Sequence, residues 1–240
     1  MKLSDFKVLT FDCYGTLIDW ETGMTDALAP LTARLENKLS QNEILEAHAR
    51  YESFQQRQTP AKLYRDVLAI VYRRLAEEWG LSVDWEECIR YGNSIKDWPA
   101  FPDTADALKY LKQHYKLVIL SNVDHASFAE SHKKLGVDFD AIYTAEAIGS
   151  YKPADANFEY MLAMFKGLGF NKSDILHTAE SMFHDHAPAN RHGIHSCWIY
   201  RRYAKEGFGA TMHPGEMPSF DFRFNSMAEM AEAHRNETGQ

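Results

Sequence analysis

Four groups of chemically reactive residues stand out, namely Asp12, the pair Ser121-Asn122, Lys152 and the acidic stretch 180–185. Asp12 ends a short apolar run, and Gly15 then allows the chain to turn. Such β-branched and aromatic runs are typical of buried strands. The carboxyl ends of parallel strands meet at one edge of a sheet, where ligands bind. We therefore expect a carboxylate, a hydroxyl with an amide, an ammonium and further acids to lie together at one site.

The elements that must position these groups alternate along the chain. Strand-like runs occur at 6–12, 116–121, 139–144, 174–179 and 195–200. Helix-like stretches separate them, at 104–114, 126–135, 156–168 and 185–192. This alternation predicts an α/β fold whose core is a doubly wound, mostly parallel sheet.

Between residues 20 and 99 the pattern changes to long amphipathic helices, such as 41–58 and 61–79, with no convincing strand. Two prolines close together, Pro99 and Pro102, forbid helix continuation and mark the return to the core. We expect a core domain of residues 1–19 and 100–240, and an inserted helical cap domain of residues 20–99.

The composition is that of an ordinary globular protein, with 240 residues, 45% hydrophobic residues and a net charge of -8. Scattered basic residues argue against nucleic acid, and no apolar stretch is long enough for a membrane helix. Three isolated cysteines, Cys13, Cys88 and Cys197, fit a reducing compartment. We expect a cytoplasmic protein with a small-molecule partner, no nucleic acid and no membrane.

The order and spacing of Phe11-Asp12-Cys13-Tyr14-Gly15-Thr16, Ser121-Asn122, Tyr151-Lys152-Pro153 and the acidic loop ending at Asp185 resemble the haloacid dehalogenase superfamily, in particular its L-2-haloacid dehalogenase branch. The resemblance covers essentially the whole chain and implies a Rossmann-like core with a helical cap over the site. It implies that Asp12 is the nucleophile and that Lys152 holds its charge and orientation. Dehalogenases of this branch are often dimers, so the resemblance admits a homodimer.

The remaining site residues follow from the same resemblance. The expected catalytic residues are Asp12, Lys152, Asp185, Thr16 and Ser121, and the turn amides of residues 14–16 are expected to face Asp12. The expected substrate-binding residues are Tyr14, Trp20, Asn122, Glu180, Met182, His184 and Phe158. Some of them have a structural alternative: a strand-end acid such as Asp12 often caps a turn, Lys152 could be a solvated lysine, and Ser121-Asn122 could cap a helix.

Tyr14 decides the reaction class, because phosphatases of the superfamily have an aspartate there that protonates the leaving oxygen and helps to hold Mg²⁺. A phenol with a pKa near 10 serves neither purpose, which disfavours phosphoryl transfer. We therefore predict that Asp12 attacks C2 of a small 2-substituted carboxylate, inverting that carbon. Water then cleaves the aspartyl ester, with Asp185 positioning it. This chemistry requires no organic cofactor and no metal.

Two departures from the dehalogenases concern the leaving group. The halide-binding arginine of the first cap helix is replaced, since any register places Leu45, Glu46 or Ala47 there. Arg50, about one turn later, could substitute for it, but this would move the cation by several ångströms. The Ser-x-Asn of the last motif is Glu180-Ser181-Met182. An added acid and an absent cation suit a cationic leaving group, to which Trp20 could offer its π face.

The chain is thus similar to a member of this branch that opens the ring of L-azetidine-2-carboxylate, giving 4-amino-2-hydroxybutyrate. L-2-haloacid dehalogenation is the alternative, and a phosphatase-like or non-catalytic member of the superfamily is a further one. Glu180 could instead be salt-bridged, and Trp20 could serve only cap packing. The sequence around His184 and His186 lacks a third spaced ligand, which argues against zinc.

Overall fold

The computed structural model describes residues 1–239, and its core is one parallel sheet of six strands in the order β3-β2-β1-β4-β5-β6. The strands are β1 (Val8–Phe11), β2 (Lys116–Ser121), β3 (Ala141–Thr144), β4 (Ile175–Ala179), β5 (His195–Ile199) and β6 (Phe222–Phe224). The chain order reverses beside β1, so the predicted doubly wound α/β fold is confirmed. Ligands of such sheets bind at this switch point.

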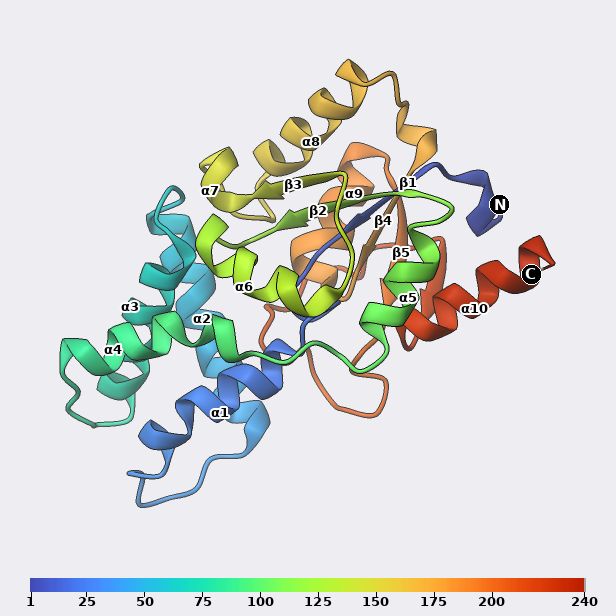
Figure 1. The fold of residues 1–240 in the computed structure, drawn as a ribbon. Coiled ribbons are helices and arrows are strands. Elements are labelled where there is room, and N and C mark those ends of the chain that lie inside the picture. The colour runs from blue at the N-terminus through green and yellow to red at the C-terminus, as the bar shows by residue number, and fades with distance from the viewer. Residues whose placement is uncertain (240) are drawn as a thin grey trace.

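Helices cover both faces of the sheet (Figure 1). The helices and helical turns of the core are η1 (Leu3–Asp5), α5 (Thr104–Leu111), α6 (His125–Leu135), α7 (Ala145–Ile148), α8 (Asp155–Gly167), η3 (Lys172–Asp174), the π-helical turn η4 (Met182–His186), α9 (Ala187–His192) and α10 (Met227–Thr238). Successive strand residues point to opposite faces. Leu9 and Phe11 accordingly pack in the core formed with α5, α6 and α10, whereas Val8 packs in the core formed with α8 and α9.

The chain between β1 and β2 forms a helical insertion of α1 (Trp20–Thr32), α2 (Gln41–Gln58), α3 (Tyr64–Glu78), α4 (Trp85–Gly92) and η2 (Asn93–Asp97). It lies beyond the carboxyl ends of the strands (Figure 1). In α3 the buried positions Tyr64, Val67, Leu68, Val71 and Leu75 recur at helical spacing, which gives the insertion an apolar core of its own.

Two C-terminal elements were not predicted from the sequence. Strand β6 has three residues and is half-exposed, so it carries little strand signal. Helix α10 packs on α5 and buries Met227, Met230 and Ala231. Its start is marked by Ser226, whose hydroxyl accepts a hydrogen bond from the Glu229 amide, a spacing typical of a helix N-terminus.

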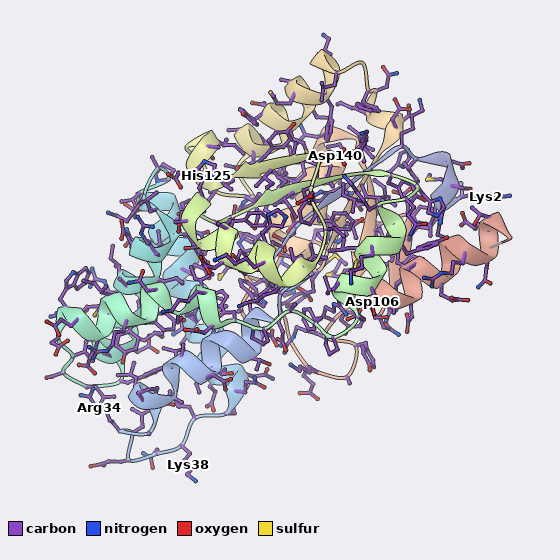
Figure 2. The ribbon with its side chains drawn as sticks, in the orientation of Figure 1. Lys2, Arg34, Lys38, Asp106, His125 and Asp140 are labelled. Carbon is purple, nitrogen blue, oxygen red and sulfur yellow. The ribbon has the colours of Figure 1, made fainter. Side chains whose placement is uncertain are left out.

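The surface carries many charged side chains, among them the exposed Lys2, Arg34, Lys38 and Asp106 (Figure 2). No helix within residues 1–239 has the length and apolar character needed to cross a bilayer.

Candidate active site

Lys152 is the centre of a buried ionic cluster at the carboxyl ends of the strands. Its Nζ donates to Asp12 Oδ1 at 2.9 Å, to Asp185 Oδ1 at 2.6 Å and to the Leu120 carbonyl at 2.8 Å. All three protons of the ammonium are therefore used, and its side chain is 1% exposed. Burial lowers the pKa of Lys152, but the two carboxylates outweigh that effect and raise it above its usual value.

Asp12 follows β1 directly and is held through both of its oxygens. Thr16 Oγ1 donates to Asp12 Oδ2 at 3.1 Å and itself accepts a 2.9 Å hydrogen bond from the Glu180 amide. Burial raises the pKa of Asp12 to about 6, although Lys152 opposes this shift. Asp12 is therefore ionised at neutral pH, and its low hydration makes it a stronger nucleophile than a carboxylate in water.

The turn after Asp12 differs in one respect from the expected arrangement. The Gly15 amide donates to the Ile18 carbonyl at 2.8 Å and thus does not face Asp12. Gly15 has a φ of 96°, and a Cβ there would lie 2.9 Å from Nε1 of Trp20, so glycine permits both the turn and the close approach of the indole.

Asp185 belongs to a hydrogen-bonded chain that continues into the sheet. His177 Nε2 donates to Asp185 Oδ1 at 2.9 Å, and His177 Nδ1 accepts from Thr10 Oγ1 at 2.8 Å, the tautomer being assigned from these partners. Burial alone would raise the pKa of Asp185, but Lys152 and His177 together hold it well below its usual range. Sequence reasoning missed Thr10 and His177, although a histidine within the apolar run of β4 is a visible signal.

Two polar atoms in this cluster are buried without a hydrogen-bond partner among the described residues, Ser121 Oγ and Asp185 Oδ2. Unpaired buried polar atoms are costly, and in an active site they mark positions where a substrate or water binds. Asn122, in contrast, has a partner for each of its side-chain polar atoms. Its side chain accepts from the Lys152 amide at 2.7 Å and donates to the Lys152 carbonyl at 3.0 Å, and so positions Lys152.

A small cavity of about 20 Å³ lies against these groups. It brings together eight of the predicted site residues, namely Asp12, Tyr14, Trp20, Ser121, Asn122, Lys152, His184 and Asp185. Three lining residues were missed, namely Glu52, Tyr64 and Ser181. The volume corresponds to about one water molecule, so a substrate enters only when the helical insertion or a lining side chain moves.

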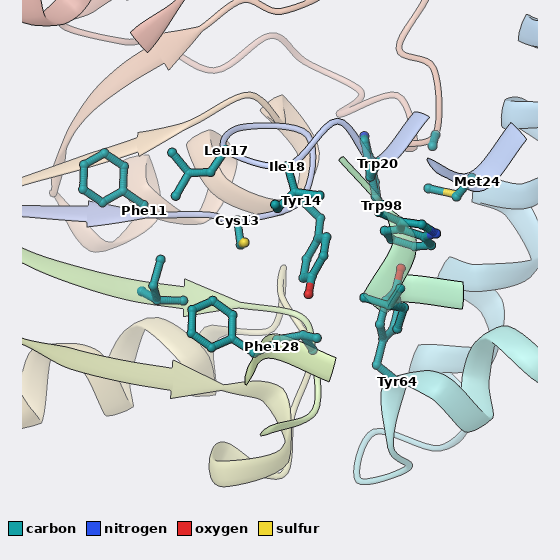
Figure 3. Close-up of a cluster of buried hydrophobic side chains, with 14 of the residues drawn as sticks. Phe11, Cys13, Tyr14, Leu17, Ile18, Trp20, Met24, Tyr64, Trp98 and Phe128 are labelled. Atoms are coloured by element: carbon teal, nitrogen blue, oxygen red, sulfur yellow. The ribbon is translucent and has the colours of Figure 1, made fainter. Parts of the chain in front are cut away.

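Aromatic rings form the wall between the core and the helical insertion (Figure 3). Tyr14 packs edge-on against Trp98, with ring centroids 5.6 Å apart, and its hydroxyl points away to Ser131 Oγ at 2.9 Å. Its ring, not its hydroxyl, therefore faces the cavity. The ring centroid of Tyr64 lies 6.4 Å from that of Tyr14. Trp20, the first residue of α1, belongs to the same wall.

Three predicted substrate-binding residues do not line the cavity. Phe158 packs edge-on against His177 in the core beneath α8, and Met182 is buried in the η4 turn. The Glu180 side chain lies near Glu21 and Arg202. Burial and, to a smaller extent, the charge of Glu21 raise the pKa of Glu180 to about 8, although Arg202 opposes this shift. Glu180 is therefore largely neutral at pH 7.

The missed acid, Glu52, enters the cavity from α2 and is 4% exposed. Gln56 Nε2 donates to its Oε1 at 2.9 Å, and the His48 ring lies 3.3 Å from its Oε2. Tyr64 faces Glu52, and burial followed by the Glu52 charge raises the pKa of Tyr64 well above its usual range. The helical spacing of the sequence could have pointed to Glu52, because Leu45, His48, Glu52 and Gln56 share one face of α2.

Arg50 lies outside that face. It is exposed and pairs with Glu78 at 2.9 Å, so the idea that Arg50 replaces the cation of the dehalogenases is wrong.

Comparison with known proteins decides the family. A family model described as a haloacid dehalogenase-like hydrolase matches residues 6–178. The chain belongs to this hydrolase family. It is also 28% identical over 213 residues to an (S)-2-haloacid dehalogenase of Pseudomonas putida, and 29% identical to one of Pseudomonas fluorescens; each match covers 83% of this chain and 87% of the relative.

Solved structures of haloacid dehalogenase-like hydrolases share the fold. A defluorinating L-2-haloacid dehalogenase superposes with a TM-score of 0.76 at 18% identity, covering 98% of each chain. The L-2-haloacid dehalogenase of Xanthobacter autotrophicus, with chloropropionic acid covalently bound, superposes with a TM-score of 0.75 at 16% identity, covering 96% of this chain and 98% of that one.

Some haloacid dehalogenase-like hydrolases bind magnesium, and one such structure from Bacillus subtilis superposes with a TM-score of 0.73 at 19% identity, covering 96% of this chain and 99% of that one. The residues of this chain do not fit that ion. The Lys152 ammonium lies between Asp12 and Asp185, where a cation would bridge them, and position 14 holds a tyrosine whose hydroxyl points away. His184 and His186 bind different partners, the first Ser181 and the second Ser196 with the Ala179 carbonyl.

Proposed function

We propose that this hydrolase cleaves a small 2-substituted carboxylate through an ester to Asp12. The observation that carries this proposal is the buried Asp12–Lys152–Asp185 cluster, which keeps a poorly hydrated carboxylate ionised beside a cavity. The names of the Pseudomonas relatives and the covalently bound chloropropionic acid of the Xanthobacter structure support the same reaction type. The helical insertion would serve as the cap domain over a core of residues 1–19 and 100–240.

In the first step Asp12 attacks C2 of the substrate, the bond to the leaving group breaks and the carbon inverts. The Ser121 hydroxyl is free to donate to the substrate carboxylate. Formation of the ester removes one negative charge, which leaves Lys152 and Asp185 as a balanced pair. Electrostatics within the site thus favour the covalent intermediate.

In the second step water adds to the carbonyl carbon of Asp12 and the ester bond between that carbon and the substrate oxygen breaks. One water proton ends on the hydroxyl oxygen of the 2-hydroxy acid. The other is released as Asp12 returns to a carboxylate, and it passes to the amine of a ring-opened product or, after halide displacement, to solvent. Asp185 Oδ2, which has no partner among the described residues, would accept a hydrogen bond from that water. Because the pKa of Asp185 is low, Asp185 positions the water and does not retain its proton.

The leaving group follows from the charge of the cavity. Three carboxyl groups line it, those of Asp12, Glu52 and Asp185, against the single ammonium of Lys152. A departing halide would meet net negative charge, whereas a protonated amine would be stabilised by Glu52 and by the π face of Trp20. We therefore propose ring opening of L-azetidine-2-carboxylate, in which the C2–N bond breaks and the amine remains attached to the product, 4-amino-2-hydroxybutyrate.

Halide displacement is the second candidate, and the names of the relatives favour it. One assay decides between them. The purified chain is incubated with L-azetidine-2-carboxylate and with L-2-chloropropionate, while primary amine and chloride are measured. Formation of a primary amine without chloride supports ring opening, and chloride release alone refutes it.

A single turnover in ¹⁸O water tests the ester itself. The label should enter the Asp12 carboxylate and not the product, and Asp12→Asn should abolish turnover. Label found only in the first product molecule would refute the covalent mechanism.

A further inference from the structure

A second cavity, of about 350 Å³, adjoins the active site at the seam between α2 and the core loop around Lys152. Its walls include Ser53, Gln56 and Arg57 on one side, and Tyr151, Ala154 and Phe183 on the other. It is far larger than the cavity at Asp12 and suits a whole small-molecule substrate.

The two cavities are separated by a thin wall. Lys152 lines both of them. Ser53 and Gln56 of the outer cavity are neighbours of Glu52, and the Gln56 side chain donates to Glu52. On the opposite side Phe183, in the outer cavity, packs edge-on against His184, in the inner one, with ring centroids 4.9 Å apart. Movement of these few side chains would connect the cavities.

The outer cavity has the opposite electrostatic character to the inner one. No carboxyl group is among the described residues that line it, and Arg57 supplies a guanidinium. Arg57 donates to Ser53 Oγ at 2.7 Å and forms no ion pair with the described residues. Most of its donors thus remain available, and the fork of a guanidinium matches a carboxylate.

We propose that this outer cavity is an access site, where Arg57 binds the carboxylate of the incoming substrate before the substrate reaches Asp12. This inference rests on the proposed function, which makes the substrate a small carboxylate. Three carboxyl groups line the active-site cavity, so a cation just outside it raises the local concentration of a carboxylate substrate where the repulsion is weaker.

The test compares Arg57→Gln with Arg50→Gln in the full chain. Both remove one exposed arginine from α2, but Arg50 points away from the seam toward Glu78. With the carboxylate that the wild type turns over, Arg57→Gln should lower kcat/KM about 10-fold, mainly through a higher KM. The decrease of kcat/KM with rising ionic strength should also be less steep in this variant than in the wild type. Arg50→Gln should leave both unchanged.

Ala154→Glu gives an independent variant that keeps Arg57 and adds a carboxylate to the exposed opposite wall. It should raise KM by a similar factor, and melting temperatures confirm that each variant is folded. If the wild type turns over small carboxylates while Arg57→Gln matches Arg50→Gln, the access site is refuted and the proposed function stands. If the wild type turns over none, the proposed function fails and the access site fails with it.

Discussion

Replacing Lys152 by methionine tests whether one ammonium neutralises two buried carboxylates. The change keeps most of the side-chain length but leaves Asp12 and Asp185 without their shared donor. Lys152 is 1% exposed and contacts them at 2.9 Å and 2.6 Å. Removing one partner from such a buried cluster costs about 3–5 kcal/mol, which corresponds to a fall in melting temperature of roughly 10 °C for a chain of this size.

The same variant should change the pH dependence in a defined direction. Without Lys152, burial and the Asp185 charge both raise the pKa of Asp12 further above 6. The acid then takes up a proton near neutral pH, so the nucleophile is lost and turnover falls at least about 10³-fold at pH 7. Because that proton relieves the repulsion, the loss of stability should be smaller at pH 5.5 than at pH 8.

Urea unfolding at both pH values measures the stability change, and the release of product measures turnover. Lys7→Met is the matched control, since Lys7 forms a 2.7 Å ion pair with Asp174 but is 66% exposed. The urea midpoint of Lys7→Met should be nearly that of the wild type, because an exposed ion pair contributes little to stability. An inactive Lys152→Met that unfolds at the wild-type urea concentration at pH 8 would refute the idea that Lys152 balances two buried charges.

Three further outcomes are expected. In wild type the single-turnover rate should fall about tenfold per pH unit below about 6, because protonation removes the Asp12 nucleophile; a flat profile from pH 5 to 8 would contradict this. Glu52→Gln should raise KM for L-azetidine-2-carboxylate about 10-fold but should not weaken competitive inhibition by L-2-chloropropionate, with the exposed Glu46→Gln as control; equal losses for both compounds would remove Glu52 from amine recognition. His177→Phe should slow ester hydrolysis about 10-fold more than ester formation, seen by mass spectrometry as accumulation of the ester on Asp12, because Asp185 loses a donor; equal slowing of both steps would point to a general structural role.

The arrangement of the core residues follows from local pattern and one topological rule. Asp12 and Ser121 end apolar runs, and parallel strands bring such ends together, so their meeting with Lys152 and Asp185 could be expected before any coordinates. His177 was missed because the pattern of a strand does not indicate which face of the sheet holds buried hydrogen-bonded side chains such as Thr10 and His177. The Gly15 amide was misplaced because a turn residue has several acceptors within reach, among them Ile18.

Residues from the helical insertion were harder to anticipate. The amphipathic pattern of α2 shows that Leu45, Glu52 and Gln56 share a face, but not that this face meets the site and not another helix. Orientation of that kind depends on tertiary packing, here on the aromatic wall of Tyr14, Tyr64 and Trp98. The same limit applies to Glu180, whose neighbours Glu21 and Arg202 are distant in the sequence.

The side chains at Asp12 are divided between two parts of the chain. Asp12, Lys152 and Asp185, to which we assign the ester chemistry, come from loops and turns at the carboxyl ends of the strands, while Glu52 comes from α2, a helix of 18 residues. A new leaving-group preference could therefore arise by replacing residues on one side of a single helix, without disturbing the nucleophile. Divergence of substrate range among such enzymes needs few steps, and laboratory evolution of this scaffold has a short and well-defined stretch to randomise.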